Sequence, residues 1–278
     1  MFTINVSDYQ LEFMLCAAIV SFLISYLSYE TIITVAEQKH LMDEPGERSS
    51  HHKKVPTLGG IAIYLSLLVV LMLLGSFLNT KLMLMSLASL SVLLFLGLKD
   101  DLLILASRKK FFIQVLTGII FIAVTDLRIT SLFGVLGFTS LTYLHSFLFS
   151  LFVFVLIINA YNMIDGIDGL AGGFGVIGTL VFSGLLYSEN QLGLAVIGIS
   201  AASALIAFLR LNLSQNKKIF MGDTGTMIVG FCLAILTLGF LNTSDLDIHS
   251  NYHESAPVLA IAILFFPLLD TLRVFVLR

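Results

Sequence analysis

The stretch NAYNMIDGIDGLAGG, residues 159–173, joins the apolar run 147–158 to the apolar run 174–186. Its polar side chains recur at every third position, at Asn159, Asn162, Asp165 and Asp168. In an α-helix each such step turns by about −60°, so the four side chains would cover one half of the cylinder. Gly166 and Gly169 can then break or bend the helix. Oxygen-bearing side chains on one face suit a hard cation or a hydroxyl-rich ligand.

A solvated helix end is the simpler explanation for polar residues at the edge of a membrane span. It accounts well for a single Asp-Gly. It accounts poorly for four polar residues at a fixed spacing, in a chain with two further acidic stretches of the same kind.

The composition is that of a membrane protein. Of the 278 residues, 58% are hydrophobic and only 12% are charged, with a mean hydropathy of +0.99. A water-soluble globule carries far more charge. Runs of suitable length predict an all-α polytopic integral membrane protein with about nine or ten transmembrane helices. The nine candidate spans are 10–36, 57–78, 82–98, 111–125, 143–161, 170–187, 191–209, 224–241 and 256–276.

Thirteen of the fifteen Lys and Arg residues fall in loops, or at the end of the chain, that the predicted spans place on one face of the membrane. They are Lys39, Arg48, Lys53, Lys54, Lys99, Arg108, Lys109, Lys110, Arg210, Lys217, Lys218, Arg273 and Arg278. Only Lys81 and Arg128 fall on the opposite face. Because basic loops stay in the cytosol, the N-terminus is predicted outside, and the active site in cytosolic loops.

The first cytosolic loop, DEPGERSSHHKKVPTLGG at 43–60, is cationic and rich in turn residues. A positive-inside anchor would explain its lysines. It would not explain why Pro-Thr-Leu-Gly-Gly leads directly into a span. Backbone N–H groups of this stretch, at the start of a helix, could approach a phosphate. The loop is therefore predicted to bind an anion.

A second loop begins with Lys99-Asp100-Asp101, immediately after the third span. Adjacent carboxylates repel each other unless a cation lies nearby. A solvated acidic pair beside the basic residues 108–110 is the alternative explanation.

The loop KKIFMGDTGTM, residues 217–227, carries one more carboxylate. Gly222 and Gly225 flank Asp223 and leave the backbone free to present it. Thr224 and Thr226 are candidate caps of the helix that follows.

Carboxylates and cations are thus predicted to meet on one face, which is what phosphoryl transfer with a divalent metal requires. The spans are nearly free of charge, with only Glu12, Glu30 and Asp270 near their ends. A lipid-linked sugar carrier or flippase would more often place charged groups near the midplane, and a structural scaffold needs no acidic cluster. An enzyme at the membrane surface is the favoured class.

Four stretches together resemble the polyprenyl-phosphate N-acetylhexosamine-1-phosphate transferases, glycosyltransferase family 4. They are DEPGERSSHHKKVPTLGG, GLKDD, NAYNMIDGIDGLAGG and FMGDTGTMIVGF, in the order of the family. FMGDTG and PLLDTLRV look more like the branch that loads N-acetylglucosamine 1-phosphate than the branch that loads phospho-MurNAc-pentapeptide, which remains the alternative.

The resemblance implies transfer of a sugar 1-phosphate from a UDP-N-acetylhexosamine to undecaprenyl phosphate, with release of UMP. This would be the first membrane step of a cell-envelope polysaccharide such as O-antigen or teichoic acid. It implies Mg²⁺ as the cofactor, with Mn²⁺ as a substitute. It also implies a multi-pass protein in the lipid of the bacterial inner (cytoplasmic) membrane, with no nucleic-acid partner and compatible with a homodimer.

Site roles follow from the same resemblance. Asp223 is expected to bind Mg²⁺, together with Asn162. Asp100 and Asp101 are expected to face the acceptor phosphate, and with Asp223 they make up the catalytic set. The expected substrate-binding residues are Arg48, His51, Lys53, Thr57, Asn159, Asp165 and Asp168.

The resemblance also predicts a His-containing cytosolic loop after the last span, and residues 1–278 contain none. The expectation is a single transmembrane catalytic domain over 1–278 that lacks this loop. His51 and His52 match a different element of the family.

Overall fold

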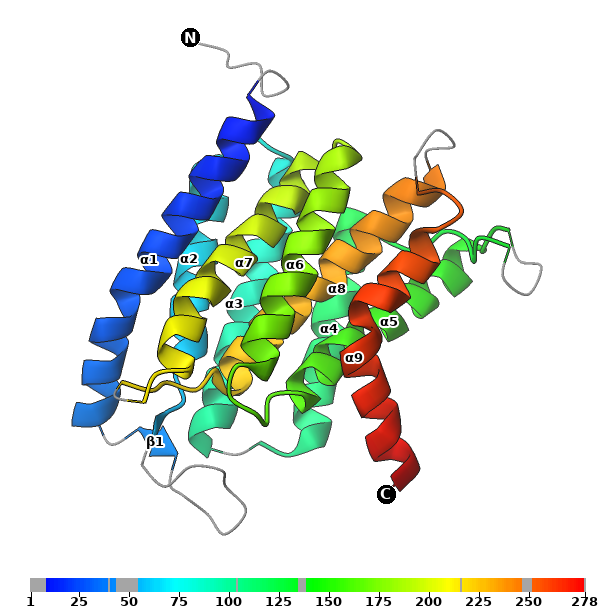
Figure 1. Cartoon of the computed structure of the whole chain (residues 1–278). Coiled ribbons are helices and arrows are strands. Elements are labelled where there is room, and N and C mark those ends of the chain that lie inside the picture. The colour runs from blue at the N-terminus through cyan, green and yellow to red at the C-terminus, as the bar shows by residue number, and fades with distance from the viewer. Residues whose placement is uncertain are drawn as a thin grey trace.

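The computed structural model describes residues 9–39, 41–43, 55–103, 105–134, 139–215, 217–246 and 252–277. Within these residues nine α-helices form one bundle (Figure 1). They are α1 (Gln10–Gln38), α2 (Gly59–Leu74), α3 (Thr80–Leu103), α4 (Ser107–Thr125), α5 (Tyr143–Met163), α6 (Leu170–Ser188), α7 (Leu192–Asn212), α8 (Gly222–Leu246) and α9 (Ala256–Leu277). Each predicted span corresponds to one helix, which confirms the all-α prediction for the described residues.

The described residues contain one short antiparallel pair of strands. β1 (Met42–Asp43) pairs with β2 (Val55–Pro56), with Met42 opposite Pro56. The pair joins the two ends of the first predicted cytosolic loop and leads directly into α2.

Seven of the helices are long and apolar enough to cross a membrane. The chain is therefore a polytopic helical membrane protein. α2 has 16 residues, about 24 Å of helix, against a hydrocarbon core of about 30 Å. α4 begins with three basic residues, at 108–110, and so has too short an apolar stretch of its own. The count of nine or ten spans remains a prediction.

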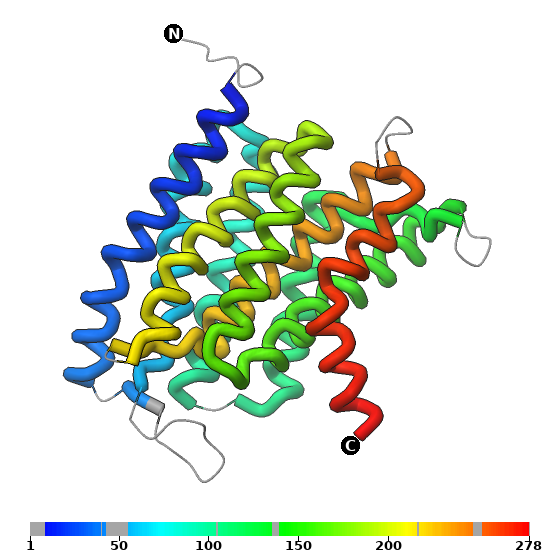
Figure 2. Tube along the Cα trace, viewed as in Figure 1, coloured from blue at the N-terminus to red at the C-terminus, as the bar shows by residue number. Residues whose placement is uncertain are grey.

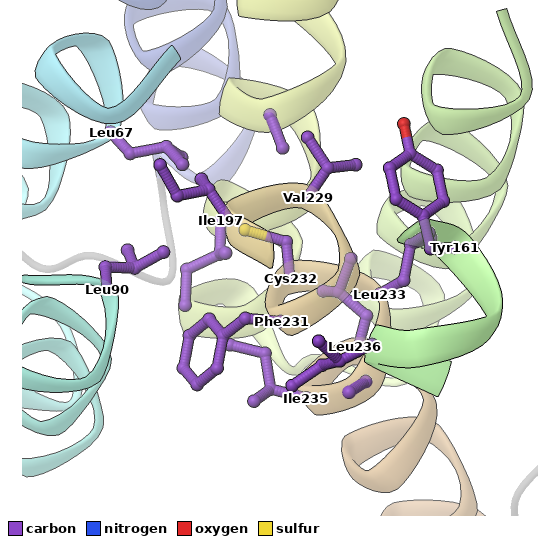
Figure 3. Packing of buried hydrophobic residues seen from close by; sticks show 14 of the residues in the cluster. Leu67, Leu90, Tyr161, Ile197, Val229, Phe231, Cys232, Leu233, Ile235 and Leu236 are labelled. Carbon is purple, nitrogen blue, oxygen red and sulfur yellow. The ribbon is translucent and has the colours of Figure 1, made fainter. Parts of the chain in front are cut away.

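The centre of the bundle is α8. Every residue from 224 to 241 is buried, and the helix contacts α2, α3, α4, α5, α6, α7 and α9. Side chains leave α8 toward the neighbouring helices, where Leu67 of α2, Leu90 of α3 and Ile197 of α7 lie (Figure 3). A helix that is apolar on every side can be covered on every side by protein.

The least buried of the candidate spans are α1 and α9, which lie at opposite edges of the bundle (Figure 2). The polar connections gather at one end, the lower end in Figure 1. There α3 passes into α4, α5 into α6, and α7 into α8, so the three acidic stretches of the sequence meet.

Candidate active site

Asp223 occupies the first turn of α8, directly after a backbone reversal. Gly222 has φ of +70°, the left-handed region that favours glycine, as its flanking position predicts. The side-chain nitrogen of Asn162, in the last turn of α5, donates to Asp223 Oδ1 at 2.6 Å and to Thr226 Oγ1 at 2.6 Å. The two residues predicted to share a metal thus lie in direct contact.

Asp100 is buried, with 4% of its surface exposed, near the end of α3. Its Oδ1 accepts a hydrogen bond of 2.6 Å from the backbone N–H of Leu105. The Lys110 ammonium of α4 forms an ion pair with Asp100 Oδ2 and lies 3.1 Å from Asp223 Oδ2. Lys110 therefore links two of the three predicted catalytic carboxylates.

Lys110 was not among the predicted site residues. In the sequence it is only one of the basic residues that orient the chain. Lys109 and Lys110 are adjacent and chemically identical, and only the rotation of α4 places Lys110 over the site while Lys109 is exposed.

Asp101 lies against the start of α8. Its Oδ1 accepts the backbone N–H of Asp223 at 2.7 Å, and its Oδ2 accepts the backbone N–H and the hydroxyl of Thr224 at 3.1 and 2.6 Å. The prediction that Thr224 and Thr226 cap α8 is wrong, because the carboxylate of another helix takes the free N–H groups. The Thr226 hydroxyl donates to Asp223 O.

The four polar residues of the stretch 159–173 separate into two pairs, because α5 ends at Met163. Asn159 lies one turn before Asn162 in α5 and donates to the side chain of Gln114 in α4 at 2.7 Å. Asp165 and Asp168 lie in the connection to α6, which Gly169 closes with φ of +76°. The helix is interrupted within the predicted stretch, but it ends before Gly166, so the prediction that all four side chains share one helical face is wrong.

Asp165 lies near three other carboxylates. Solvent reaches its side chain, but the surrounding protein atoms hinder hydration, and the carboxylates of Asp223, Asp101 and Asp168 repel its charge. These effects raise the pKa of Asp165 to about 7, with poor hydration the larger cause. A cation brought into the site would lower the pKa again.

Asp168 forms an ion pair with Lys218, in the connection between α7 and α8. Beside it, the side-chain oxygen of Asn212 accepts the backbone N–H of Gly169 at 2.7 Å, and its nitrogen donates to Ile219 O at 3.0 Å. These contacts fix the 164–169 connection to the loop that leads from α7 into α8, just before Asp223.

Residues 55–60 pack against the same loop. The N–H groups of Gly59 and Gly60 donate to the carbonyls of Phe220 and Met221, both at 3.0 Å. Gly59 and Gly60 therefore cannot supply the N–H groups predicted to approach a phosphate, because protein carbonyls already accept both donors. Thr57 is half-buried here, and its carbonyl lies so close to Gly222 that a Cβ there would be 2.2 Å away. Arg48, His51 and Lys53 lie outside the described residues.

Gly97 allows α3 to touch the start of α8. A Cβ on Gly97 would lie 2.3 Å from Thr224 Cα and 2.7 Å from Thr224 N. Both atoms belong to the backbone, so they cannot move aside without moving the helix.

We expect Gly97→Ala to lower both thermal stability and activity, the latter about tenfold or more, because α8 must shift away from α3. Gly184→Ala is the matched control, since nothing lies within 4 Å of a Cβ at that position in α6. The control should be neutral or stabilising by up to about 1 kcal/mol. Thermal unfolding in detergent and turnover measure both effects, and equal behaviour of the two variants would contradict the tight junction.

The described residues contain no cluster of three His, Cys, Asp or Glu side chains that could hold a metal alone. Asp223 and Asn162 nevertheless offer hard oxygen donors beside Asp165. Mg²⁺ is commonly held by one or two carboxylates, with water and substrate phosphates completing its shell. The donors at this site fit a metal that arrives with a phosphorylated substrate.

Comparison with known proteins gives a consistent result. The profile of glycosyl transferase family 4 matches residues 82–240. The chain is 29% identical over 248 residues to the undecaprenyl-phosphate alpha-N-acetylglucosaminyl 1-phosphate transferase of Yersinia pestis, covering 86% of this chain and 64% of that protein.

Two further relatives carry the same name. The protein of Escherichia coli K12 is 28% identical over 244 residues, which are 86% of this chain and 64% of the relative. The protein of Salmonella typhi is 28% identical over 261 residues, which are 91% of this chain and 69% of the relative. The chain thus spans just under two thirds of the length of the Yersinia and Escherichia proteins.

Proposed function

Because the chain belongs to glycosyl transferase family 4, we propose that it transfers N-acetylglucosamine 1-phosphate from UDP-N-acetylglucosamine to undecaprenyl phosphate and releases UMP. One observation carries the proposal. Asp100, Lys110, Asn162 and Asp223 come from separate stretches of the chain and converge at one end of a membrane bundle. A soluble nucleotide sugar and a lipid phosphate can meet only at the membrane surface.

The proposed reaction balances without a net proton transfer. An oxygen of the lipid phosphate attacks the phosphorus that bears the sugar, and a new diphosphate bond forms. The bond between the two phosphates of the donor breaks, and UMP leaves with that electron pair. A phosphate monoester has a second pKa of about 6, so most of the acceptor is already dianionic at neutral pH. Asp100 is therefore not needed as a strong base.

Both substrates are anions, so the protein has to offset their repulsion. We assign this role to Lys110, whose ammonium lies within reach of the site and is oriented by Asp100 and Asp223. Asp223 and Asn162 would hold Mg²⁺, or Mn²⁺ in its place. When bound, the metal would supply charge compensation for the diphosphate. The family resemblance implies that Asp165 and Asp168 act near the donor, in a connection that Lys218 and Asn212 hold in place.

Release of UMP tests the proposal. Purified protein is incubated with UDP-N-acetylglucosamine, Mg²⁺ and polyprenyl phosphate, and UMP is measured with and without the lipid. We expect lipid-dependent UMP, and a higher kcat/KM with this donor than with UDP-N-acetylgalactosamine or UDP-MurNAc-pentapeptide. A preference for either competitor would reassign the donor. A lipid-linked sugar carrier would release no UMP.

We also propose that the site faces the cytosol of a bacterial cell, with the protein in the inner membrane and its N-terminus outside. The support is the thirteen-to-two distribution of basic residues. Cysteines at Asn242 and Ser214, at opposite ends of the bundle, test this in a background without Cys16 and Cys232. In intact cells an impermeant thiol reagent should label position 242 and spare position 214 until the membrane is opened. The reverse pattern would contradict both the topology and the cytosolic site.

A further inference from the structure

Asp101 is the feature that the proposed reaction does not use. Its two carboxylate oxygens accept three hydrogen bonds, all from Asp223 and Thr224 at the start of α8. The first N–H groups of a helix have no partner within the helix, and a carboxylate is their most favourable external partner. Both oxygens of Asp101 therefore point at protein rather than at the space where a substrate phosphate would bind.

The surface of α3 that touches α8 extends over two turns. Gly97 and Asp101 are four residues apart, so they lie on the same face of α3. Gly97 permits backbone contact with Thr224. Asp101, one turn further along α3, accepts hydrogen bonds from the N–H groups of Asp223 and Thr224. Gly222 completes the fit, because a Cβ at that position would lie 2.8 and 3.0 Å from the two oxygens of Asp101. Three features thus fit the end of α3 to the first turn of α8.

We propose that Asp101 is a positioning residue: it fixes the first turn of α8 on α3 and so holds the Asp223 carboxylate in its working position, without touching either substrate. The proposal rests on the proposed function for its kinetic consequences. It differs from the sequence-based expectation that Asp101 faces the acceptor phosphate beside Asp100. Asp100 pairs with Lys110, and Asp101 pairs with the backbone of α8.

Asp101→Asn is the direct test. An amide has one acceptor oxygen, so at least one of the three donors must face an NH₂ group. We expect kcat to fall about tenfold or more, because Asp223 is displaced. We expect the KM for polyprenyl phosphate to stay within about twofold, because Asp101 makes no contact with that substrate. A large rise in this KM at unchanged kcat would overturn the proposal.

Thr224 provides a second variant that cannot act on substrate, because it is fully buried. Thr224→Val keeps the shape and removes the hydroxyl that donates to Asp101 at 2.6 Å. It should lower kcat in the same direction as Asp101→Asn, and Thr224→Ser should restore most of the loss. The two changes should combine to less than the product of their separate effects. Wild-type kcat in Thr224→Val, or fully independent effects, would contradict a shared role.

Hydrogen–deuterium exchange keeps the test separate from the activity. The peptide covering residues 221–226 should exchange faster in Asp101→Asn and Thr224→Val than in wild type, whereas a peptide within α6 should not change. If wild-type protein releases no UMP, the proposed function fails, and the exchange experiment still decides whether Asp101 holds α8. Unchanged exchange in both variants would overturn the positioning role.

Discussion

Asp223→Asn should lower turnover by roughly a hundredfold or more while leaving a folded, extractable protein. The substitution removes the charge that faces Lys110 and Asn162, and with it the proposed main ligand of the metal. The backbone N–H of residue 223 can still donate to Asp101, so the start of α8 is retained. Turnover is measured at saturating substrates over a range of Mg²⁺ concentrations, and thermal unfolding reports on the fold.

Asp126→Asn is a suitable control. Asp126 lies at the opposite end of the bundle, where its largely exposed carboxylate pairs with Arg128. This variant should turn over like wild type. Near-wild-type turnover of Asp223→Asn at limiting Mg²⁺ would remove Asp223 from the proposed metal site.

Lys110→Met should lower both activity and stability. It removes the cation that links Asp100 and Asp223, and it leaves the carboxylate of Asp100 buried without a counter-charge. Breaking a buried pair typically costs about 3–5 kcal/mol. We expect the low end of that range, because the Lys110 side chain is 24% exposed. Turnover should fall about a hundredfold or more, since the proposed phosphate-binding charge is lost.

Two further variants separate these effects. Lys109→Met removes the same charge from the exposed neighbouring position and should leave activity and stability close to wild type. The double change Asp100→Asn with Lys110→Met removes the unpaired charge and should recover much of the stability but not the activity. Recovery of activity in the double variant would show that Lys110 serves only to neutralise Asp100.

The sequence predicted the helices well, because the membrane leaves an apolar helix as the main option for each run of about twenty residues. It also placed Asn162 beside Asp223, although 61 positions separate them. That success depended on the resemblance to a family and on the distribution of basic residues. Periodicity alone favoured a continuous helical face over residues 159–168, whereas α5 ends at Met163.

The features that were not predicted depend on the rotation of each helix about its axis and on the distance between helices. Neither can be read from the sequence. Lys110 could not be distinguished from Lys109 before the rotation of α4 was known. The Pro-Thr-Leu-Gly-Gly stretch was interpreted as a phosphate-binding helix start because free N–H groups were assumed, whereas those of Gly59 and Gly60 pair with the carbonyls of Phe220 and Met221. When every span is uniformly apolar, the sequence does not indicate which helix is central, because a leucine side chain packs equally well against lipid and against protein.

The central place of α8 has a consequence for biosynthesis. Of the helices that α8 contacts, only α9 follows it in the chain, and α2 to α7 all precede it. During synthesis the ribosome releases Asp100, Lys110 and Asn162 long before Asp223. The earlier helices therefore cannot reach their final packing until α8 has been made. The site can become complete only after α8 has been synthesised and has packed among the earlier helices.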